Sequence, residues 1–429
     1  MELLFCCNCI SEKSIFVQML KQERVLIIGK VWPEPNSSAA GKRMMQLISF
    51  FQLKKIEVIF VSAAKTTDFQ VDLKQLDIEF QQVQLNDDSF DAYVKSKAPD
   101  IVVFDRFLSE EQFGWRIDEC APNAIKILNT EDLHFLRGAR EEALRKGEKI
   151  DVTKIRTDLF QRELLSIYRS DLTLLVSQFE KNLLTNHYLL PEELLYYLPV
   201  FEKKQKEIQT FEDRKDFMFI GNFYHAPNWD ALKVLKSEIW PRIKKSIPEA
   251  KLHIYGAYPG QRVFDMNNVK EGFIVHGRVE NAIEVTEKAK VSLVPLRFGA
   301  GIKGKLLEAM GAGTPSVTTE IGVEGMLFDN MWNGKFTNDF ELFSVFAIEL
   351  YQDKNKWTIA QENGFEILSK YFSESDFSLS FEMKIQDLLK NRDTFRQKNI
   401  VGSLMKHHTV QSSKYLSKWI MEKNKEHKD

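Results

Sequence analysis

A glycine-rich stretch at residues 295–319 gathers the residue types that can bind an anionic group. It reads PLRFGAGIKGKLLEAMGAGTPSVTT and combines five glycines with Arg297, Lys303 and Lys305 between two apolar runs. Glycines let the backbone approach a ligand closely, and a helix N-terminus presents free N–H groups and the positive end of its dipole. The stretch therefore predicts a diphosphate site at the start of a helix. A glycine-rich loop with solvated lysines is the alternative explanation.

Glu308 lies one helical turn beyond these lysines. Its carboxylate can accept hydrogen bonds from the two vicinal hydroxyls of a ribose, as acidic residues do in other nucleotide sites. Alternatively, Glu308 forms an ordinary helix-surface pair with Lys305, three residues earlier. Spacing alone leaves both explanations open.

Two series of strand-like and helix-like runs must position this stretch. Short β-branched runs alternate with longer amphipathic patterns, which predicts βαβ units and parallel sheets. The strand-like runs are residues 24–30, 57–62, 101–104, 125–129 and 172–176, and then 216–222, 251–257, 273–278, 291–296 and 315–319. A polar segment at 201–215 separates the two series. The sequence therefore predicts an α/β protein with domains at residues 23–205 and 206–375.

The composition is that of a globular protein without a nucleic-acid signature. The chain has 429 residues, of which 44% are hydrophobic and 28% charged, and its formal net charge is −2. This length predicts two or three domains, and this charge gives no reason to expect a nucleic-acid partner. No run approaches the roughly 18 apolar residues of a membrane span. The N-terminal tail, residues 1–22, lacks the features of a signal peptide.

The cysteines predict a reducing, cytoplasmic setting. Cys6, Cys7 and Cys9 crowd into the N-terminal tail and Cys120 stands alone, so they form no disulfide framework. The three clustered thiols could be palmitoylated or bind a metal. No second Cys/His pair completes a zinc set, so incidental thiols in a tail are the simpler explanation.

The C-terminal end predicts a helix followed by a basic tail. Residues 376–390 have an amphipathic pattern, and residues 391–429 are rich in lysine. A basic amphipathic tail can make a peripheral contact with an anionic membrane. Because apolar residues are sparse here, we favour a solvated, partly ordered extension.

The stretch at residues 295–319 resembles the nucleotide-sugar loop of GT-B glycosyltransferases of family 4, the glycosyl transferases group 1. That family commonly has a strand ending in proline, a glycine loop, and then EAM and G-x-P, as in LLEAMGAGTPSVTT here. DRFLSEEQFGWR (105–116), LNTEDLHFLR (128–137) and FIGNFYHAPNWDALK (219–233) resemble segments of one branch of the family, in the same order. The resemblance spans residues 24–326 and both predicted domains.

This resemblance implies two Rossmann-like domains that face each other across a cleft. The donor would bind mainly to the C-terminal domain and the acceptor to the N-terminal domain, and the helix at 376–390 would cross back to the N-terminal domain. Family members transfer a sugar from a nucleoside diphosphate, usually with retention of configuration and without a metal. We therefore expect a metal-independent, retaining transferase of UDP- or GDP-linked hexose. The acceptor, whether glycan, lipid or small molecule, stays unidentified, and no cofactor is expected because the nucleotide-sugar is a co-substrate.

The resemblance also implies roles for individual residues. His134, which follows a predicted strand in TEDLH, is the candidate catalytic residue close to the reacting sugar carbon, and Glu131 is the alternative side chain there. No metal ligands are expected. The residues expected to bind the nucleotide-sugar are Gly41, Asp132, Arg278, Gly299, Gly301, Ile302, Lys303, Lys305 and Glu308.

The sequence departs from the family at Ala300. Many members have two glutamates eight residues apart, and Glu308 matches the second while Ala300 replaces the first. That first carboxylate often contacts the donor sugar, so its loss leaves donor identity and activity open. A base expected after the first C-domain strand is also missing, and Lys303 and Lys305 would supply charge for the leaving diphosphate instead.

Three alternatives follow from these departures and from the fold class. A non-catalytic sugar-nucleotide binding protein and another GT-B enzyme, such as a sugar-nucleotide epimerase, remain open. A dinucleotide-dependent oxidoreductase is disfavoured, because RVLIIGK is not followed by G-x-G-x-x-G.

Overall fold

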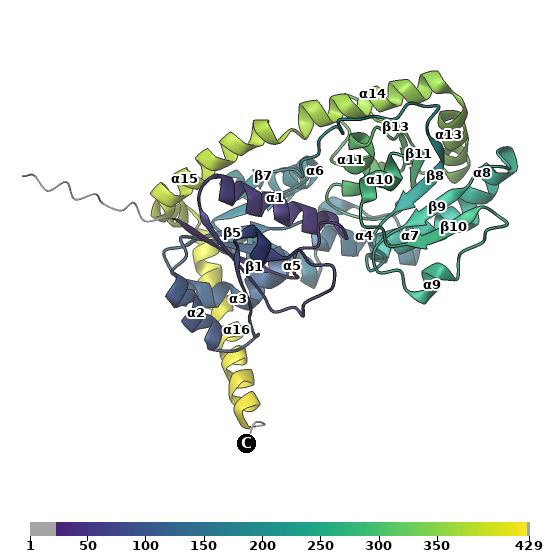
Figure 1. The fold of residues 1–429 in the computed structure, drawn as a ribbon. Coiled ribbons are helices and arrows are strands. Elements are labelled where there is room, and N and C mark those ends of the chain that lie inside the picture. The colour runs from purple at the N-terminus through teal and green to yellow at the C-terminus, as the bar shows by residue number, and fades with distance from the viewer. Residues whose placement is uncertain (1–22, 427–429) are drawn as a thin grey trace, which may run out of the picture.

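A computed structural model describes residues 23–426, which form two α/β domains (Figure 1). One seven-stranded sheet has the order β3-β2-β1-β4-β5-β6-β7, and one six-stranded sheet has the order β10-β9-β8-β11-β12-β13. All strand pairings within both sheets are parallel. The predicted α/β class with two Rossmann-like domains is therefore confirmed.

The N-terminal domain contains the seven-stranded sheet. Its strands are β1 (Arg24–Gly29), β2 (Glu57–Ser62), β3 (Glu79–Gln82), β4 (Ile101–Asp105), β5 (Ile125–Asn129), β6 (Leu172–Leu175) and β7 (Leu195–Tyr197). Its α-helices are α1 (Ala39–Leu53), α2 (Ser89–Lys97), α3 (Arg106–Cys120), α4 (His134–Lys146), α5 (Asp158–Arg169) and α6 (Gln178–Asn182). Short 3₁₀ or π turns are η1 (Leu73–Leu76), η2 (Val152–Lys154), η3 (Leu183–His187) and η4 (Glu192–Leu194).

The C-terminal domain contains the six-stranded sheet. Its strands are β8 (Lys215–Ile220), β9 (Leu252–Tyr255), β10 (Phe273–Gly277), β11 (Ala289–Val294), β12 (Ser316–Thr318) and β13 (Gly334–Phe336). Its helices are α7 (Ala226–Val234), the π-helix η5 (Leu235–Ile239), α8 (Trp240–Ser246), α9 (Gln261–Phe264), α10 (Ala282–Thr286), α11 (Gly304–Gly311), α12 (Glu320–Val323), α13 (Phe340–Gln352) and α14 (Lys354–Tyr371). Residues 198–214, between β7 and β8, contain no helix or strand.

Most of the strands found from the sequence are buried on both faces; β9 and β10 are partly exposed. In β1, Leu26 and Ile28 belong to one apolar cluster of the N-terminal domain, while Val25 and Ile27 belong to the cluster on the other face. Parallel sheets covered by helices produce such continuous apolar runs. The strands that sequence patterns missed, β3, β7 and β13, are the short strands at sheet edges, and β3 is exposed throughout.

The helix α15 (Glu374–Lys398) crosses back to the N-terminal domain, as the resemblance implied. Its Phe381 packs against Phe50 of α1, with ring centroids 4.7 Å apart. Figure 1 shows this helix running from the end of α14 to the side of the first sheet. It is longer than the predicted segment at 376–390 and changes direction at Asn391, whose backbone is not helical.

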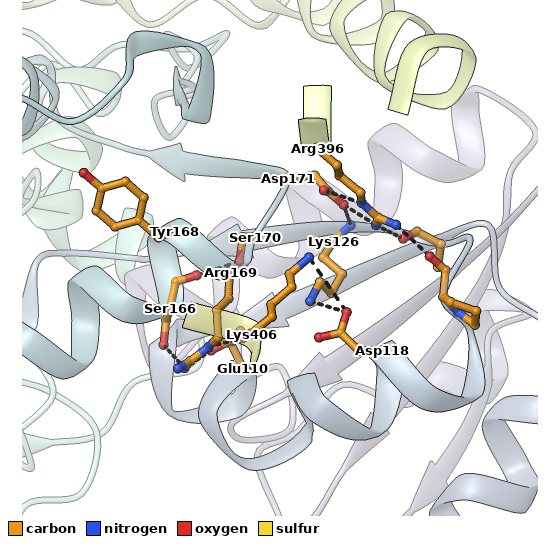
Figure 2. A network of polar contacts seen from close by, with 12 residues as sticks. Glu110, Asp118, Lys126, Ser166, Tyr168, Arg169, Ser170, Asp171, Arg396 and Lys406 are labelled. Atoms are coloured by element: carbon orange, nitrogen blue, oxygen red, sulfur yellow. Dashed lines mark hydrogen bonds and ion pairs between the residues drawn. The ribbon is translucent and has the colours of Figure 1, made fainter. Parts of the chain in front are cut away.

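The lysine-rich end is helical in its described part, although we expected a partly ordered extension. Helix α16 (Ile400–Glu426) packs against α3 and α5. Arg396 holds the end of α15, just before α16: its guanidinium donates to both carboxylate oxygens of Asp171, at 2.8 and 2.7 Å, and to the carbonyls of Pro122 and Ala124 (Figure 2). Burial would raise the pKa of Asp171, but Arg396 lowers it overall. The sequence pattern missed this docking because charged side chains carry it.

Part of α16 faces outward. Ile400, Leu404, Leu416 and Trp419 are each more than half exposed. Nearby lysines 418, 423 and 425 are also exposed. Within residues 23–426, no helix combines the length and apolar character needed to span a membrane. Cys6, Cys7 and Cys9 lie outside the described residues.

Candidate active site in the interdomain cleft

A cavity of about 400 Å³ lies between the two domains. The N-terminal domain lines it with Pro35 in the loop after β1, Arg106 after β4 and Glu131 after β5. The C-terminal domain lines it with Gly221 after β8 and Gly256 after β9. These positions are the carboxyl ends of parallel strands, where open α/β sheets bind ligands. The cavity is therefore the candidate active site.

The glycine loop before α11 contacts both the cavity and the opposite domain. Gly299 and Ile302 line the cavity. Gly301 instead packs against the N-terminal domain: its φ is +62°, and a Cβ there would lie 2.9 Å from the Cβ of Asp132. Its N–H donates to Oε1 of Glu180 at 2.7 Å. Glycine is needed here because the left-handed backbone and the close approach both exclude a side chain.

Lys305 supplies a cation to the cavity one residue into α11. Its Nζ donates to Oδ1 of Asn228 at 2.6 Å and lies 4.5 Å from the ring centroid of Phe219. Burial lowers the pKa of Lys305 to about 7. The ε-amino group of Lys305 is therefore about half protonated near neutral pH, and a bound anion would favour its protonated, charged form.

Lys303 lines the cavity but is turned inward, and Arg297 does not line it. The Nζ of Lys303 donates to the carbonyl of Gly301 at 2.5 Å. Burial lowers the pKa of Lys303 to about 8, against the opposing effect of Glu324. Arg297 forms a two-pronged pair with Asp230 at 2.7 and 2.5 Å. Of the three bases in the stretch, Lys305 is therefore best placed for a phosphate.

Glu308 lines the cavity one turn beyond Lys305, as expected. Its neighbour is Lys42 of α1, whose Nζ lies 3.5 Å from Oε1 of Glu308 and also contacts Glu202. Burial raises the pKa of Glu308, while Lys42 opposes this effect. The helix-surface explanation is not supported, because only 20% of the Glu308 side chain is exposed and its carboxylate lies 3.5 Å from Lys42 of the opposite domain.

His134 is the first residue of α4 and lines the cavity. Its Nδ1 lies 3.1 Å from the carbonyl of Asp132 and its ring meets Phe107 edge-on. Glu163 of α5 accepts from the backbone N–H groups of His134 and Phe135, at 3.1 and 2.9 Å. This carboxylate caps α4 and fixes the start of the helix. The contact of Nδ1 with the carbonyl of Asp132 orients the imidazole.

Two carboxylates precede His134 in the cavity wall. Asp132 pairs with Arg137; burial raises its pKa, but Arg137 and His134 lower it overall. Glu131 has a left-handed backbone, φ +64°, and accepts from Asn129 at 2.7 Å. Burial, and secondarily a nearby aspartate, raises the pKa of Glu131 to about 8. Burial therefore favours the protonated form of Glu131, whereas Arg137 favours the ionised form of Asp132.

Gly41 and Arg278, like Gly301, were predicted contacts that do not line the cavity. Gly41 is buried in α1 under the preceding loop, where a Cβ would lie 2.3 Å from the carbonyl oxygen of Glu34. The absence of a side chain at Gly41 allows the loop at Glu34 to pack directly on α1. The guanidinium of Arg278 lies over the ring of Phe69, 4.0 Å from its centroid, and the next residue, Val279, lines the cavity instead.

Other lining residues were not expected from the sequence. Ala300 lies in the wall and packs with the apolar cluster of the N-terminal domain, so no side chain there reaches a ligand polar group. Lys42 and Arg106 are cavity cations missed by sequence reasoning. Arg106 could have been found, because it directly follows a predicted strand. His225 also lines the cavity, and burial lowers its pKa to about 4.

Within the described residues, no three histidine, cysteine, aspartate or glutamate side chains come together as a potential metal site.

Comparison with known proteins gives one family match over part of the chain and a shared fold. Residues 214–352 match the family model of glycosyl transferases group 1. The chain has the GT-B fold of these glycosyltransferases, and the resemblance seen in the sequence is confirmed. No curated protein sequence gives a significant match.

Solved structures similar to this chain include three at low sequence identity. Sucrose-phosphate synthase from Thermosynechococcus elongatus has a TM-score of 0.65 at 12% identity, over 86% of this chain and 100% of that chain. TarM from S. aureus, solved with UDP, α-GlcNAc-glycerol and fondaparinux, has a TM-score of 0.65 at 11% identity, over the same shares of the two chains. HepE from Anabaena, solved with UDP and glucose, has a TM-score of 0.61 at 14% identity, over 86% of this chain and 100% of that chain. Identities this low show a shared fold.

Proposed function

We propose that this protein is a glycosyltransferase that moves a sugar from a nucleoside-diphosphate sugar to an acceptor hydroxyl. One observation carries the proposal: a cavity between two Rossmann-like domains brings together the glycine loop, Lys305 and Glu308 at the start of α11. The loop and helix lie within the segment that matches the glycosyltransferase family. UDP in the structures of TarM and HepE supports UDP, ahead of GDP, as the nucleotide of the donor.

We assign the diphosphate to Lys305 and the loop N–H groups, and the ribose to Glu308. In this scheme the bond between the sugar and the diphosphate breaks while the acceptor oxygen bonds to the same carbon. Negative charge grows on the leaving diphosphate, and Lys305 and the N-terminus of α11 stabilise it without a metal. The leaving phosphate takes the acceptor proton on the same face, which gives retention of configuration.

Changing Glu308 to glutamine is expected to weaken UDP binding by about tenfold, one hydrogen bond to a charged group being worth about 1.5–3 kcal/mol. The loss should be smaller for 2′-deoxy-UDP and 3′-deoxy-UDP, because these lack one of the hydroxyls that the carboxylate would hold. Calorimetric titration of the three nucleotides checks this. Equal losses for all three would remove Glu308 from the ribose.

Changing His134 to alanine is expected to leave UDP affinity within about twofold and to lower sugar transfer by about 10²-fold or more, as loss of a group that orients the reacting atoms does. The nucleotide sits on the other domain, whereas the imidazole would contact the sugar. Initial rates of UDP release with a working acceptor, beside UDP titrations, separate the two effects. Full turnover in this variant would exclude His134 from the site.

The experiment that tests the function is a binding and turnover panel. Thermal shift with UDP, GDP, ADP and their sugars identifies the donor, since a ligand at 100 times its dissociation constant adds about 2.7 kcal/mol of stability. Release of nucleotide from the bound sugar donor in the presence of an acceptor mixture then establishes transfer. No stabilisation by any of these nucleotides would contradict the proposal.

Ala300 motivates a second candidate, a sugar-nucleotide binding protein without turnover. The wall at Ala300 offers no carboxylate to the donor sugar. Binding of a nucleotide-sugar without release of nucleotide would favour this candidate. Epimerisation of the free sugar nucleotide, detected by chromatography, would favour another GT-B enzyme.

We further propose a cytoplasmic protein that makes a peripheral contact with anionic membranes through α16. The exposed apolar residues of α16 stand beside exposed lysines, the combination that interfacial helices use. Co-sedimentation with phosphatidylglycerol vesicles, compared with phosphatidylcholine vesicles, tests this contact. Equal and negligible binding to both would contradict it.

A further inference from the structure

The lysines and arginines in the cavity wall differ in whether they already have a hydrogen-bond partner. Five basic side chains, those of Lys42, Arg106, Arg137, Lys303 and Lys305, line the cavity. Four of them donate a hydrogen bond or form a close ion pair: Lys42 with Glu202, Arg137 with Asp132, Lys303 with a carbonyl and Lys305 with an amide oxygen. Within residues 23–426, no hydrogen-bond acceptor is found for the guanidinium of Arg106.

Arg106 is nevertheless largely buried. Its side chain is 19% exposed, and its nearest carboxylate oxygen, Oδ1 of Asp105, lies 3.8 Å from Nε, beyond hydrogen-bond distance. A guanidinium has five N–H donors, and a molecule bound against Arg106 would separate them from water unless it accepted their hydrogen bonds. The backbone of Arg106 is left-handed, φ +69°, a conformation that residues other than glycine seldom adopt.

Against the effect of burial, Asp105, Glu131 and Asp132 raise the pKa of Arg106, but within residues 23–426 none of them accepts a hydrogen bond from its guanidinium. Asp132 is engaged by Arg137. Glu131 accepts from Asn129 at 2.7 Å, and burial raises its pKa, which favours its protonated form. Asp105 accepts through its other oxygen from the backbone N–H of Lys30, at 3.2 Å. The guanidinium thus retains donors for an incoming group.

Arg106 belongs to the wall opposite the nucleotide residues. It begins α3 of the N-terminal domain, whereas Lys305 and Glu308 lie on α11 of the C-terminal domain. Burial lowers the pKa of His225, a residue of the C-terminal domain that also lines the cavity, and the charges of Arg137 and Arg106 lower it further. The charge of Arg106 therefore acts on a residue of the opposite domain. In the proposed reaction, an acceptor would meet the donor sugar between these two walls.

We propose that Arg106 binds an oxyanion, a phosphate or carboxylate group, carried by the acceptor. This inference rests on the proposed transfer reaction and names the class of its second substrate: a hydroxyl compound with an anionic group. A planar guanidinium can pair with either oxyanion through two parallel hydrogen bonds. A neutral acceptor would leave these donors desolvated and unpaired.

The test measures a second anion site on protein already saturated with UDP, so that the diphosphate site is filled. Glycerol 3-phosphate, glycerate and glycerol are titrated into wild type, Arg106→Gln, and Arg145→Gln, which removes an exposed arginine of the same domain. Arg106→Gly is the second variant, because glycine adopts the left-handed backbone freely and the protein should fold. UDP affinity is measured first for every variant.

We expect at least one charged probe to bind wild type and Arg145→Gln at least tenfold more tightly than glycerol does. Both Arg106 variants should lose that preference while keeping wild-type UDP affinity. The stronger of the two charged probes identifies phosphate or carboxylate. Equal binding of charged and neutral probes to wild type, or an unchanged preference in the Arg106 variants, overturns the inference. Weaker UDP binding in those variants also overturns it, by placing Arg106 on the donor. If UDP fails to bind wild type, the proposed function itself fails.

Discussion

Changing Lys305 to methionine is expected to weaken UDP binding by about 10- to 150-fold, because one charge-assisted hydrogen bond is worth about 1.5–3 kcal/mol. The ammonium lies in the cavity one residue into α11, where the glycine loop and the helix dipole also favour a phosphate. Methionine keeps the apolar stem that packs beside Phe219. Calorimetric titration with UDP measures the loss.

The same substitution should remove a pH dependence. Because burial lowers the pKa of Lys305 to about 7 in the free protein, the free side chain loses its proton as the pH rises through 7. Binding a diphosphate requires the charged form and must then take up a proton. Wild-type affinity for UDP should therefore fall above pH 7, by up to about tenfold per pH unit. The variant should show no such fall.

Lys288→Met is the matched control, since Lys288 is an exposed lysine of the same domain. It should bind UDP like wild type and keep the pH dependence. UDP affinity in Lys305→Met that equals the control at pH 6.5 would contradict our assignment of the diphosphate. A pH profile unchanged by Lys305→Met would mean that another group titrates.

Changing Arg169 to leucine is expected to lower the free energy of unfolding by about 3–5 kcal/mol, the cost of breaking a buried ion pair. Arg169 of α5 donates to both oxygens of Glu110 of α3, at 3.0, 3.1 and 2.5 Å (Figure 2). The side chain of Glu110 is 1% exposed, so the variant leaves a carboxylate without its counter-ion inside the domain. Urea unfolding of the full chain measures the loss.

The exposed pair Arg145 and Glu142 provides the control for this prediction. Arg145→Leu should change stability by less than about 1 kcal/mol, because water already solvates both charges. The double variant Glu110→Leu with Arg169→Leu should recover most of the loss, since two apolar side chains can replace a buried pair. A single Arg169 variant as stable as the Arg145 variant would show that water reaches Glu110.

Local patterns were sufficient for the central strands and for the residues that follow them. Runs such as IVVFD and IKILN are mostly apolar and buried on both faces, so they indicated strands of a parallel sheet. The ligand edge of such a sheet follows from its topology. His134, Lys305 and Glu308 all line the cavity for this reason. The edge strands β3, β7 and β13 were missed, because three or four partly solvated residues carry little apolar signal.

The sequence by itself determined the two-domain α/β architecture and the place of the glycine loop at the start of a helix, because both depend on neighbours along the chain. Only the tertiary structure decided which charges serve the cavity. Lys303, two residues before Lys305, donates a hydrogen bond to the carbonyl of Gly301, and Arg297 forms an ion pair with Asp230. Lys42 and Arg106 enter the cavity from the other domain. Partners of a charged side chain are set by contacts between residues far apart in sequence, so spacing along the chain cannot separate a free cation from a paired one.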